Sequence, residues 1–272
     1  MRFSSLRRIV PLGSLVALAV STVAVHFAYL EVVWPQAEID LALAREAGQS
    51  TVRTLAVILK DIEQEICLIL MLWGFYLIAE RSLSIIRYRY LFEVDFLHTQ
   101  SGGETLDARD NIVEQMEGSF NALRKLPGNI QGTPLVQTLS ASIRRFIITH
   151  SVQNTSEAIL TGVEAVAHRM ESENAMVRYL IWAIPSIGFI GTVRGIGEAL
   201  GHADEALAGD IVNMAASLGV AFNSTFVALI ISIFLMFFLY QLQRLQDGLV
   251  TDIQAYCERF LLNRIGKANA KE

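Results

Sequence analysis

The chain carries little charge. Only 18% of its 272 residues are Asp, Glu, Lys or Arg, whereas 53% are apolar. Soluble domains carry about 25% charged residues, so this composition indicates an integral membrane protein. The net charge of −5 gives no sign of nucleic-acid binding, and the sequence has no basic patch with interleaved aromatic residues.

Cysteine and histidine are also sparse. Cys67 falls in a predicted membrane segment and Cys257 in the C-terminal tail, so we expect no disulfide between them. The five histidines are scattered without metal-ligand spacing: His26, His98, His150, His168 and His202. The sequence lacks a phosphate-binding loop and a nucleophile–base arrangement, so we expect no enzyme activity, no metal and no cofactor.

Strand-like runs and internal repeats are absent too, and what remains is a set of long apolar segments. A helix that spans a membrane needs about 20 mostly apolar residues. Four segments fit or can be extended to fit: Ile9–Leu30, Ile66–Ala79, Tyr179–Val193 and Ile211–Gln243. The second is short and needs extension to Ile86, so three spans are the alternative. The predicted fold is an all-α polytopic membrane helix bundle with four spans and long helical cytoplasmic extensions.

Basic residues predict the orientation of these spans, because short segments rich in Lys and Arg stay in the cytoplasm. They precede the first span and follow the second and the last: Arg2, Arg7, Arg8, Arg81, Arg87, Arg89, Arg244, Arg259, Arg264, Lys267 and Lys271. The connection between the last two spans, residues 201–210, has carboxylates but no Lys or Arg. Both termini are therefore predicted to be cytoplasmic. A signal peptide is the alternative at the N-terminus, but no small-x-small cleavage site precedes Glu31.

The spans divide the chain into six predicted parts. These are a first span (1–34), a periplasmic segment (35–62), a second span (63–83), a cytoplasmic helical domain (84–177), a transmembrane hairpin (178–243) and a cytoplasmic helical tail (244–272). Helical periodicity runs from Leu135 to Met176 and again from Gln241 to Leu262. These helices form a stalk, a partner-docking domain or both, and the sequence does not separate the alternatives.

The hairpin carries the residues with the clearest functional pattern. On the last span a stripe of small and hydroxyl side chains falls within one arc: Ser217, Ala221, Ser224, Thr225, Ala228 and Ser232. On the preceding span Thr192 shares a face with Pro185. We interpret this set as the ion pathway or partner-facing surface, with helix packing as the alternative for the two threonines. Gly188, Gly191 and Gly195 are predicted to let the helices approach closely.

Charge inside the hairpin is restricted to one place. Arg194 and Glu198 are four residues apart on one helix and are predicted to form an intramembrane ion pair, with titration of Glu198 as the alternative. The last span has no carboxylate, and Glu80 and Glu198 are poorly placed for proton transfer. Ion movement along these helices would therefore need an acid from a second protein.

Two motifs resemble the MotA/TolQ/ExbB proton-channel family, and its TolQ/ExbB branch most closely. Residues 184–196, Ile-Pro-Ser-Ile-Gly-Phe-Ile-Gly-Thr-Val-Arg-Gly-Ile, are similar to one family helix, and residues 220–229, Val-Ala-Phe-Asn-Ser-Thr-Phe-Val-Ala-Leu, to the next. Thr192, Thr225 and Pro185 fall on the family threonines and proline. Arg194 stands where the branch often has Trp, and Val220 stands where the family has Glu.

The resemblance implies an oligomer, a pentamer in this family, that surrounds the transmembrane helices of a single-span ExbD/TolR/MotB-like partner. The partner's membrane Asp would carry H⁺, with Na⁺ as the alternative ion. We therefore expect a stator subunit of a motor in the bacterial inner membrane, which couples the proton motive force to work such as protein transport. The alternative is an oligomeric membrane scaffold that anchors a partner and conducts no ions.

Overall fold

The computed structural model describes residues 12–46, 54–93, 96 and 108–269. All regular structure within these ranges is helical. The helices are α1 (Leu12–Ala28), η2 (Tyr29–Val33), α2 (Trp34–Glu46), α3 (Leu55–Leu59), α4 (Ile62–Arg87), η3 (Arg89–Glu93), α5 (Ala108–Arg124), α6 (Gly128–Gln131), α7 (Pro134–Thr149), α8 (Val152–Glu173), α9 (Ala175–Gly201), α10 (Ala203–Leu207), α11 (Val212–Cys257), η4 (Glu258–Leu262) and α12 (Asn263–Asn269). The predicted all-α class is confirmed.

Four helical stretches among the described residues are long and apolar enough to cross a membrane. They are Leu12–Ala44, Ile62–Glu93, Val152–Gly201 and Val212–Gly266. The prediction of four spans is confirmed by length and composition. The second stretch reaches spanning length because α4 begins four residues before the apolar run at Ile66 and carries its polar end inside the fold. Of the basic residues used to predict orientation, Arg2, Arg7, Arg8 and Lys271 lie outside the described residues.

The chain forms two compact units. Unit 1 comprises residues 1–80 and 174–241, and unit 2 comprises residues 81–173 and 242–272. Helix α11 contributes its first part, to Gln241, to unit 1 and the remainder to unit 2.

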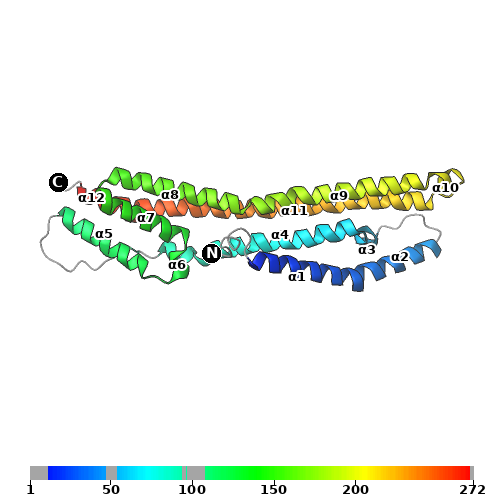
Figure 1. The fold of residues 1–272 in the computed structure, drawn as a ribbon, viewed down its shortest axis with the longest axis horizontal. Helices are drawn as coiled ribbons and strands as arrows, with labels where there is room; N and C mark the ends of the chain where they lie inside the picture. Colours follow the sequence, from blue (N-terminus) through cyan, green and yellow to red (C-terminus); the bar gives the residue numbers. More distant parts are fainter. Residues whose placement is uncertain (1–11, 47–53, 94–95, 97–107, 270–272) are drawn as a thin grey trace, which may run out of the picture. The chain divides into compact units, whose positions relative to one another are not determined.

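In unit 1, α4 lies between α1 and the pair formed by α9 and α11 (Figure 1). The indole Nε1 of Trp73 on α4 donates a hydrogen bond to the Ser14 carbonyl of α1 at 2.9 Å. On the other side of α4, the thiol of Cys67 lies 3.7 Å from the Ile184 carbonyl of α9. Polar groups of α4 thus reach backbone of both neighbours, which is how buried helices satisfy hydrogen-bonding groups away from water.

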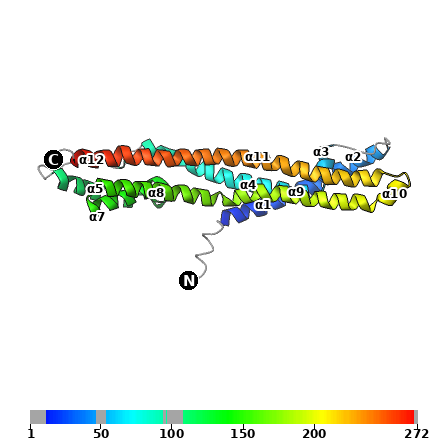
Figure 2. The ribbon, with the colours of Figure 1, turned by 90° about the horizontal axis from the view of Figure 1, so that it is seen from above.

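Unit 2 has an apolar core built by α5, α7, α8 and the C-terminal part of the chain. Its fully buried members include Met116, Leu139, Ile143, Ile159 and Ile253. Helices α7 and α8 lie side by side (Figure 2). Burial of several large side chains at about 1.5–3 kcal/mol each is sufficient to hold such a helical unit together.

The periodic stretch from Leu135 to Met176 covers α7, α8 and the first residues of α9, and the chain folds back between α7 and α8. His150 ends α7 with a left-handed backbone, φ 49°, and its N–H donates to the Phe146 carbonyl at 2.7 Å. Ser151 then accepts a hydrogen bond from the Asn154 N–H through its side chain and begins α8. The apolar period continues in both helices because each buries one face, so periodicity alone does not reveal the turn.

Candidate ion-pathway site

Helices α9 and α11 approach so closely that three glycines of α9 have no room for a side chain. A Cβ built on each glycine would meet the Cβ of Ala228 at 2.5 Å from Gly188, the Cβ and Oγ of Ser224 at 2.5 Å from Gly191, and the backbone N of Ala221 at 2.6 Å from Gly195. Contacts this short exclude any residue but glycine unless the helices separate. We call this contact the glycine seam. It places the backbones of the two helices next to each other, as small-residue packing does in membranes.

Pro185 interrupts the hydrogen bonds of α9 in the same region. A proline inside a helix has no N–H to donate to the carbonyl four residues earlier, which here is Ile181. The hydroxyl of Ser232 on α11 donates to that carbonyl at 2.8 Å. Ser232 is 6% exposed and therefore acts as the replacement donor in a buried contact between the two helices.

Thr192 and Thr225 meet beside the glycine seam. Their hydroxyl groups form a hydrogen bond with each other. Each hydroxyl also reaches a carbonyl across the contact: Thr192 lies 3.0 Å from the Ala221 oxygen, and Thr225 lies 3.2 Å from the Gly188 oxygen. Two hydroxyls and two carbonyls are thus gathered in one place within a membrane-spanning pair of helices.

The threonine pair lies at the edge of the contact away from α4. Gln64 of α4 donates to the Ser224 hydroxyl at 3.4 Å, so Ser224 faces α4. Thr225 follows Ser224, and Thr192 follows Gly191, which is also close to α4 through Glu63. One residue is about 100° of rotation around a helix. Both threonines are half-buried as a result, with part of their surface open.

The other residues of the predicted stripe are enclosed within the chain. Ser217, Ala221, Ser224, Ala228 and Ser232 are all less than 9% exposed. Ala221, Ser224 and Ala228 form the α11 side of the glycine seam. Pro185 is half-buried. The stripe therefore has two parts. Ser217, Ala221, Ser224, Ala228 and Ser232 are buried within the fold, whereas Thr225 is half-buried and lies at the edge of the contact with Thr192 and Pro185.

Arg194 is the centre of a charged cluster that joins α9 to α4. Its Nε and Nη2 donate to the two carboxylate oxygens of Glu63, both at 2.8 Å. Its Nη1 lies 3.1 Å from Glu198, the contact expected from helical spacing, and its Nη2 lies 3.9 Å from Asp61. The Glu63 side chain is only 6% exposed. A buried carboxylate is stable only when it is paired and hydrogen-bonded, and the two-pronged geometry of Arg194 provides this.

The sequence reasoning missed the acidic start of α4. Asp61, Glu63 and Glu65 precede the apolar run that begins at Ile66, and the sequence pattern alone indicated no contact for them. His26 of α1, one of the five scattered histidines, lies 2.7 Å from Glu65 Oε1 through its Nδ1. Helical spacing indicated Glu198 as a partner of Arg194, but no local pattern in the sequence joins Arg194 to the carboxylates of α4.

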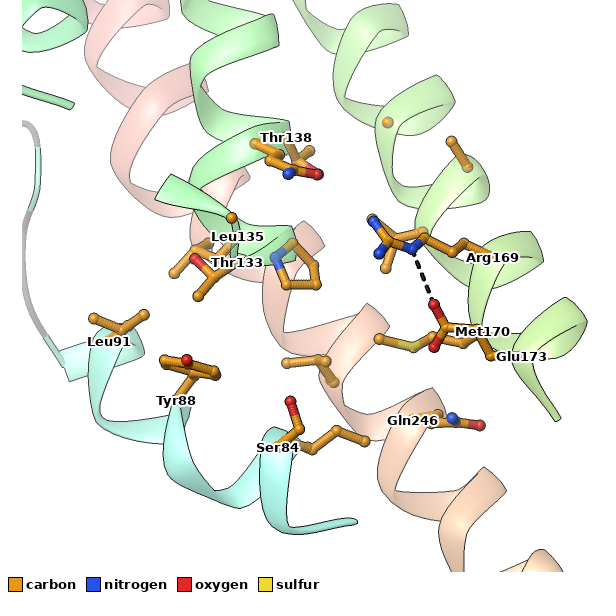
Figure 3. A pocket seen from close by; sticks show the side chains of 18 of the residues that line it. Ser84, Tyr88, Leu91, Thr133, Leu135, Thr138, Arg169, Met170, Glu173 and Gln246 are labelled. Atoms are coloured by element: carbon orange, nitrogen blue, oxygen red, sulfur yellow. Dashed lines mark hydrogen bonds and ion pairs between the residues drawn. The ribbon is translucent and has the colours of Figure 1, made fainter. Parts of the chain in front are cut away.

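Unit 2 contains a hollow of about 510 Å³ between the end of α4, α7, α8 and α11 (Figure 3). Tyr88, Leu135 and Met170 contribute much of its apolar lining. Arg169 at its rim is hydrogen-bonded to Glu173 at 3.0 Å. The lining also includes Arg81, so the hollow combines apolar surface with charged side chains.

Within the described part of the chain, no three His, Cys, Asp or Glu side chains are grouped so as to hold a metal ion. The site is therefore a set of neutral oxygens at the α9–α11 edge, with an ion-paired cluster next to it on the α4 side.

Residues 131–255 match the model of the MotA/TolQ/ExbB proton channel family. The match confirms the resemblance seen in the two motifs and covers slightly less than half of the chain. It includes the glycine seam, Thr192 and Thr225, whereas α1 and α4 lie outside it. It is a match to the whole family and does not distinguish the TolQ/ExbB branch. The chain matches no curated protein and no solved structure.

The family identifies a class of function as well as a region of the chain. It is a family of membrane proton channels rather than of enzymes. The matched helices α9 and α11 are among those long and apolar enough to span a membrane. The match therefore supports a multi-pass membrane protein of the proton-channel type.

Proposed function

We propose that the chain is the channel subunit of an ion-driven motor in the bacterial inner membrane, with both termini in the cytoplasm. Several copies, five by resemblance to the family, surround the transmembrane helices of a single-span ExbD/TolR/MotB-like partner. Ion flow between the subunits and the partner is coupled to mechanical work such as protein transport.

The observation that carries this proposal is the pair of hydroxyls at Thr192 and Thr225. The pair is fixed by the glycine seam, lies at the helix edge away from α4, and keeps part of its surface open. The hydroxyls bond each other and two backbone carbonyls, which satisfies them without water. Hydroxyl and carbonyl oxygens with part of their surface open can also replace water around a passing cation.

The partner is required because the chain supplies no free acid at this edge. Helix α11 has no carboxylate between Val212 and Gln243. Glu198 contacts Arg194, and Glu63 is fully engaged by the same arginine. A proton crossing a potential of 100 mV gains about 2.3 kcal/mol, and a group that accepts it must be present. We propose that an Asp on the partner helix is this group.

Isosteric replacement of the threonines tests the proposal. Thr192→Val and Thr225→Val remove one hydroxyl each and retain the volume. Thr22→Val is a matched control, because the exposed Thr22 hydroxyl of α1 only donates to its own helix at Leu18. Each protein is co-expressed with the single-span partner and reconstituted in liposomes, and proton uptake is followed with an internal pH dye under an imposed potential. We expect at least about tenfold lower flux for the first two variants and unchanged flux for the control.

Assembly is measured in parallel, by the mass of the purified complex. If both threonine variants assemble and conduct like the unchanged chain, the ion-pathway proposal is wrong. If neither the unchanged protein nor any variant conducts more than empty liposomes do, the chain is a scaffold that anchors its partner.

A further inference from the structure

The end of unit 1 at which α4 begins contains a second group of buried polar atoms, separate from the threonine pair. It is formed by the end of α1 with η2 and by the break between α3 and α4. Tyr29 of η2 is 1% exposed, and Gln64 of α4 is 0% exposed. Asp61 lies in the break, with its side chain 10% exposed.

One polar atom of each of these three side chains has no hydrogen-bond partner in the described chain. The atoms are the Tyr29 hydroxyl, Asp61 Oδ2 and Gln64 Oε1. A buried polar atom without a partner costs about 1–3 kcal/mol, and native proteins contain few of them. Three in one small region indicate a ligand with which they interact.

The three side chains lie on facing elements. The Asp61 carbonyl accepts hydrogen bonds from the N–H groups of Gln64 and Glu65, so these residues share the first turn of α4. The Tyr29 phenol lies within electrostatic reach of Asp61 and Glu65. Trp34 holds the two sides together, because its ring packs edge-on against Tyr29 and its Nε1 donates to the Lys60 carbonyl at 2.9 Å.

The second polar atom of the Asp61 carboxylate and of the Gln64 amide already has partners. Asp61 Oδ1 lies 3.0 Å from Lys60 Nζ and 3.9 Å from Arg194. The Gln64 amide nitrogen donates to the Ile58 carbonyl at 3.1 Å. These contacts fix the side chains and leave Oδ2 and Oε1 as acceptors.

The charges around the three atoms leave an excess of negative charge. Asp61, Glu63 and Glu65 face the two fixed cations Lys60 and Arg194. Two of the nitrogens of Arg194 bond Glu63. The partner of Glu65 is His26, at 2.7 Å, which is charged only when protonated. Glu198 adds a more exposed carboxylate on the far side of Arg194. With His26 neutral, Lys60 and Arg194 balance two of the three carboxylates Asp61, Glu63 and Glu65, and one negative charge is left for a monovalent cation.

We propose that Tyr29, Asp61 and Gln64 form a binding site for one monovalent cation, Na⁺ or a hydrated proton. Carboxylate and neutral oxygens suit a hard cation, and the excess of one negative charge favours a monovalent one. The site is distinct from the threonine pair, and cation binding here does not depend on ion flow through the proposed motor.

Thermal unfolding of the purified full-length protein tests the site. Melting is recorded in NaCl and in choline chloride at equal ionic strength, and at a series of pH values. Binding to the folded state raises the Tm in proportion to the logarithm of ligand concentration above the Kd. For a Na⁺ site we expect a rise in NaCl that choline does not give. For a hydrated proton we expect a rise on lowering the pH, with no difference between the two salts.

Two variants and a control assign the effect to these atoms. Asp61→Asn removes the charged ligand, and Tyr29→Phe removes only the hydroxyl. In both we expect the ion-dependent Tm rise to need at least about tenfold more ion. Glu173→Gln, which removes an exposed carboxylate of unit 2 that pairs with Arg169, retains the response.

Tyr29→Phe also gives a result that contradicts the proposal. If the hydroxyl has no ligand, its removal relieves a buried unsatisfied group, and the Tm rises equally in both salts and at every pH. This outcome, or responses to Na⁺ and pH that are identical in the unchanged protein and both variants, overturns the cation site. Because Tyr29→Phe keeps the ring and its packing, the test does not depend on whether Asp61→Asn folds.

Discussion

At the scale of single residues, Ser232 has a role that its place in the stripe conceals. Its hydroxyl replaces the N–H that Pro185 lacks and satisfies the Ile181 carbonyl at 2.8 Å. We predict that Ser232→Ala lowers the free energy of unfolding by about 1–3 kcal/mol, because the carbonyl is left buried without a donor. Thermal melting of the purified protein measures the loss.

Ser186→Ala is the matched control for that prediction. Ser186 is exposed, and its hydroxyl donates to the Trp182 carbonyl of its own helix at 2.9 Å. Unlike the Ile181 carbonyl, the Trp182 carbonyl retains the helical N–H of residue 186. We expect no measurable change from this variant. Equal destabilisation by both variants would show that Ser232 does not compensate for the proline.

Residue patterns predicted part of this site from the sequence. The spacing of Gly188, Gly191 and Gly195 indicated close helix packing, and Thr192 and Thr225 were identified through the two family motifs that contain them. The partner of Arg194 on α4 could not be predicted in this way, because Glu63 is far away in the chain and no local rule joins them. Helical spacing yields only Glu198, which is the weaker of the two contacts in geometry.

At the scale of elements, the glycine seam determines how α9 and α11 can pair. We predict that Gly191→Ala disrupts the hairpin, because the new Cβ would lie 2.5 Å from Ser224. Overpacking of this kind costs about 1–3 kcal/mol or more. Cysteine crosslinking or melting of the purified protein detects the altered pairing.

Gly197→Ala is the control on the same helix, since nothing lies within 4 Å of a Cβ at Gly197. Alanine favours a helix over glycine by about 1 kcal/mol, so this variant is expected to be neutral or slightly stabilising. If the two substitutions behave alike, the close approach of α9 and α11 is not what selects glycine at residue 191.

Elements were easier to predict than the contacts they make. Apolar length predicted the four spans because the requirement of the membrane is local in sequence. The fold-back at His150 was missed, since both α7 and α8 bury an apolar face and the period does not change at the turn. The sequence also did not predict which residues of the α11 stripe are buried against α9 and which lie at the edge. Residue spacing predicts which side chains share a helical face, but it does not predict which neighbouring helix covers that face.

At the scale of the whole molecule, α11 is one continuous helix that contributes to both units. Its 46 residues extend about 69 Å, whereas the hydrocarbon core of a bilayer is about 30 Å thick. The part after Gln243 lies beyond the uncharged run, and there Ile253, Tyr256 and Cys257 join the core of unit 2. A covalent probe of Cys257 therefore reports on the packing of unit 2 and not on the membrane hairpin.

We predict that Cys257 resists alkylation in the folded protein. Its side chain is 0% exposed, and burial raises the pKa of its thiol to about 12. At pH 8 the reactive thiolate is then on the order of a thousandfold scarcer than for an exposed cysteine. Cys67→Ala removes the other thiol, so iodoacetamide labelling followed by mass spectrometry measures Cys257 alone.

A displaced thiol provides the reference rate. In a Cys67→Ala, Cys257→Ser, Glu258→Cys variant the single cysteine occupies the neighbouring exposed position on the same segment. We expect it to label rapidly in the folded protein, and both proteins to label at the same rate in denaturant. Labelling of Cys257 that is as fast as the reference without denaturant would mean that the end of α11 is not packed in unit 2. Slow labelling that accelerates only when unit 2 melts would show that the last third of this helix is held by the core of unit 2.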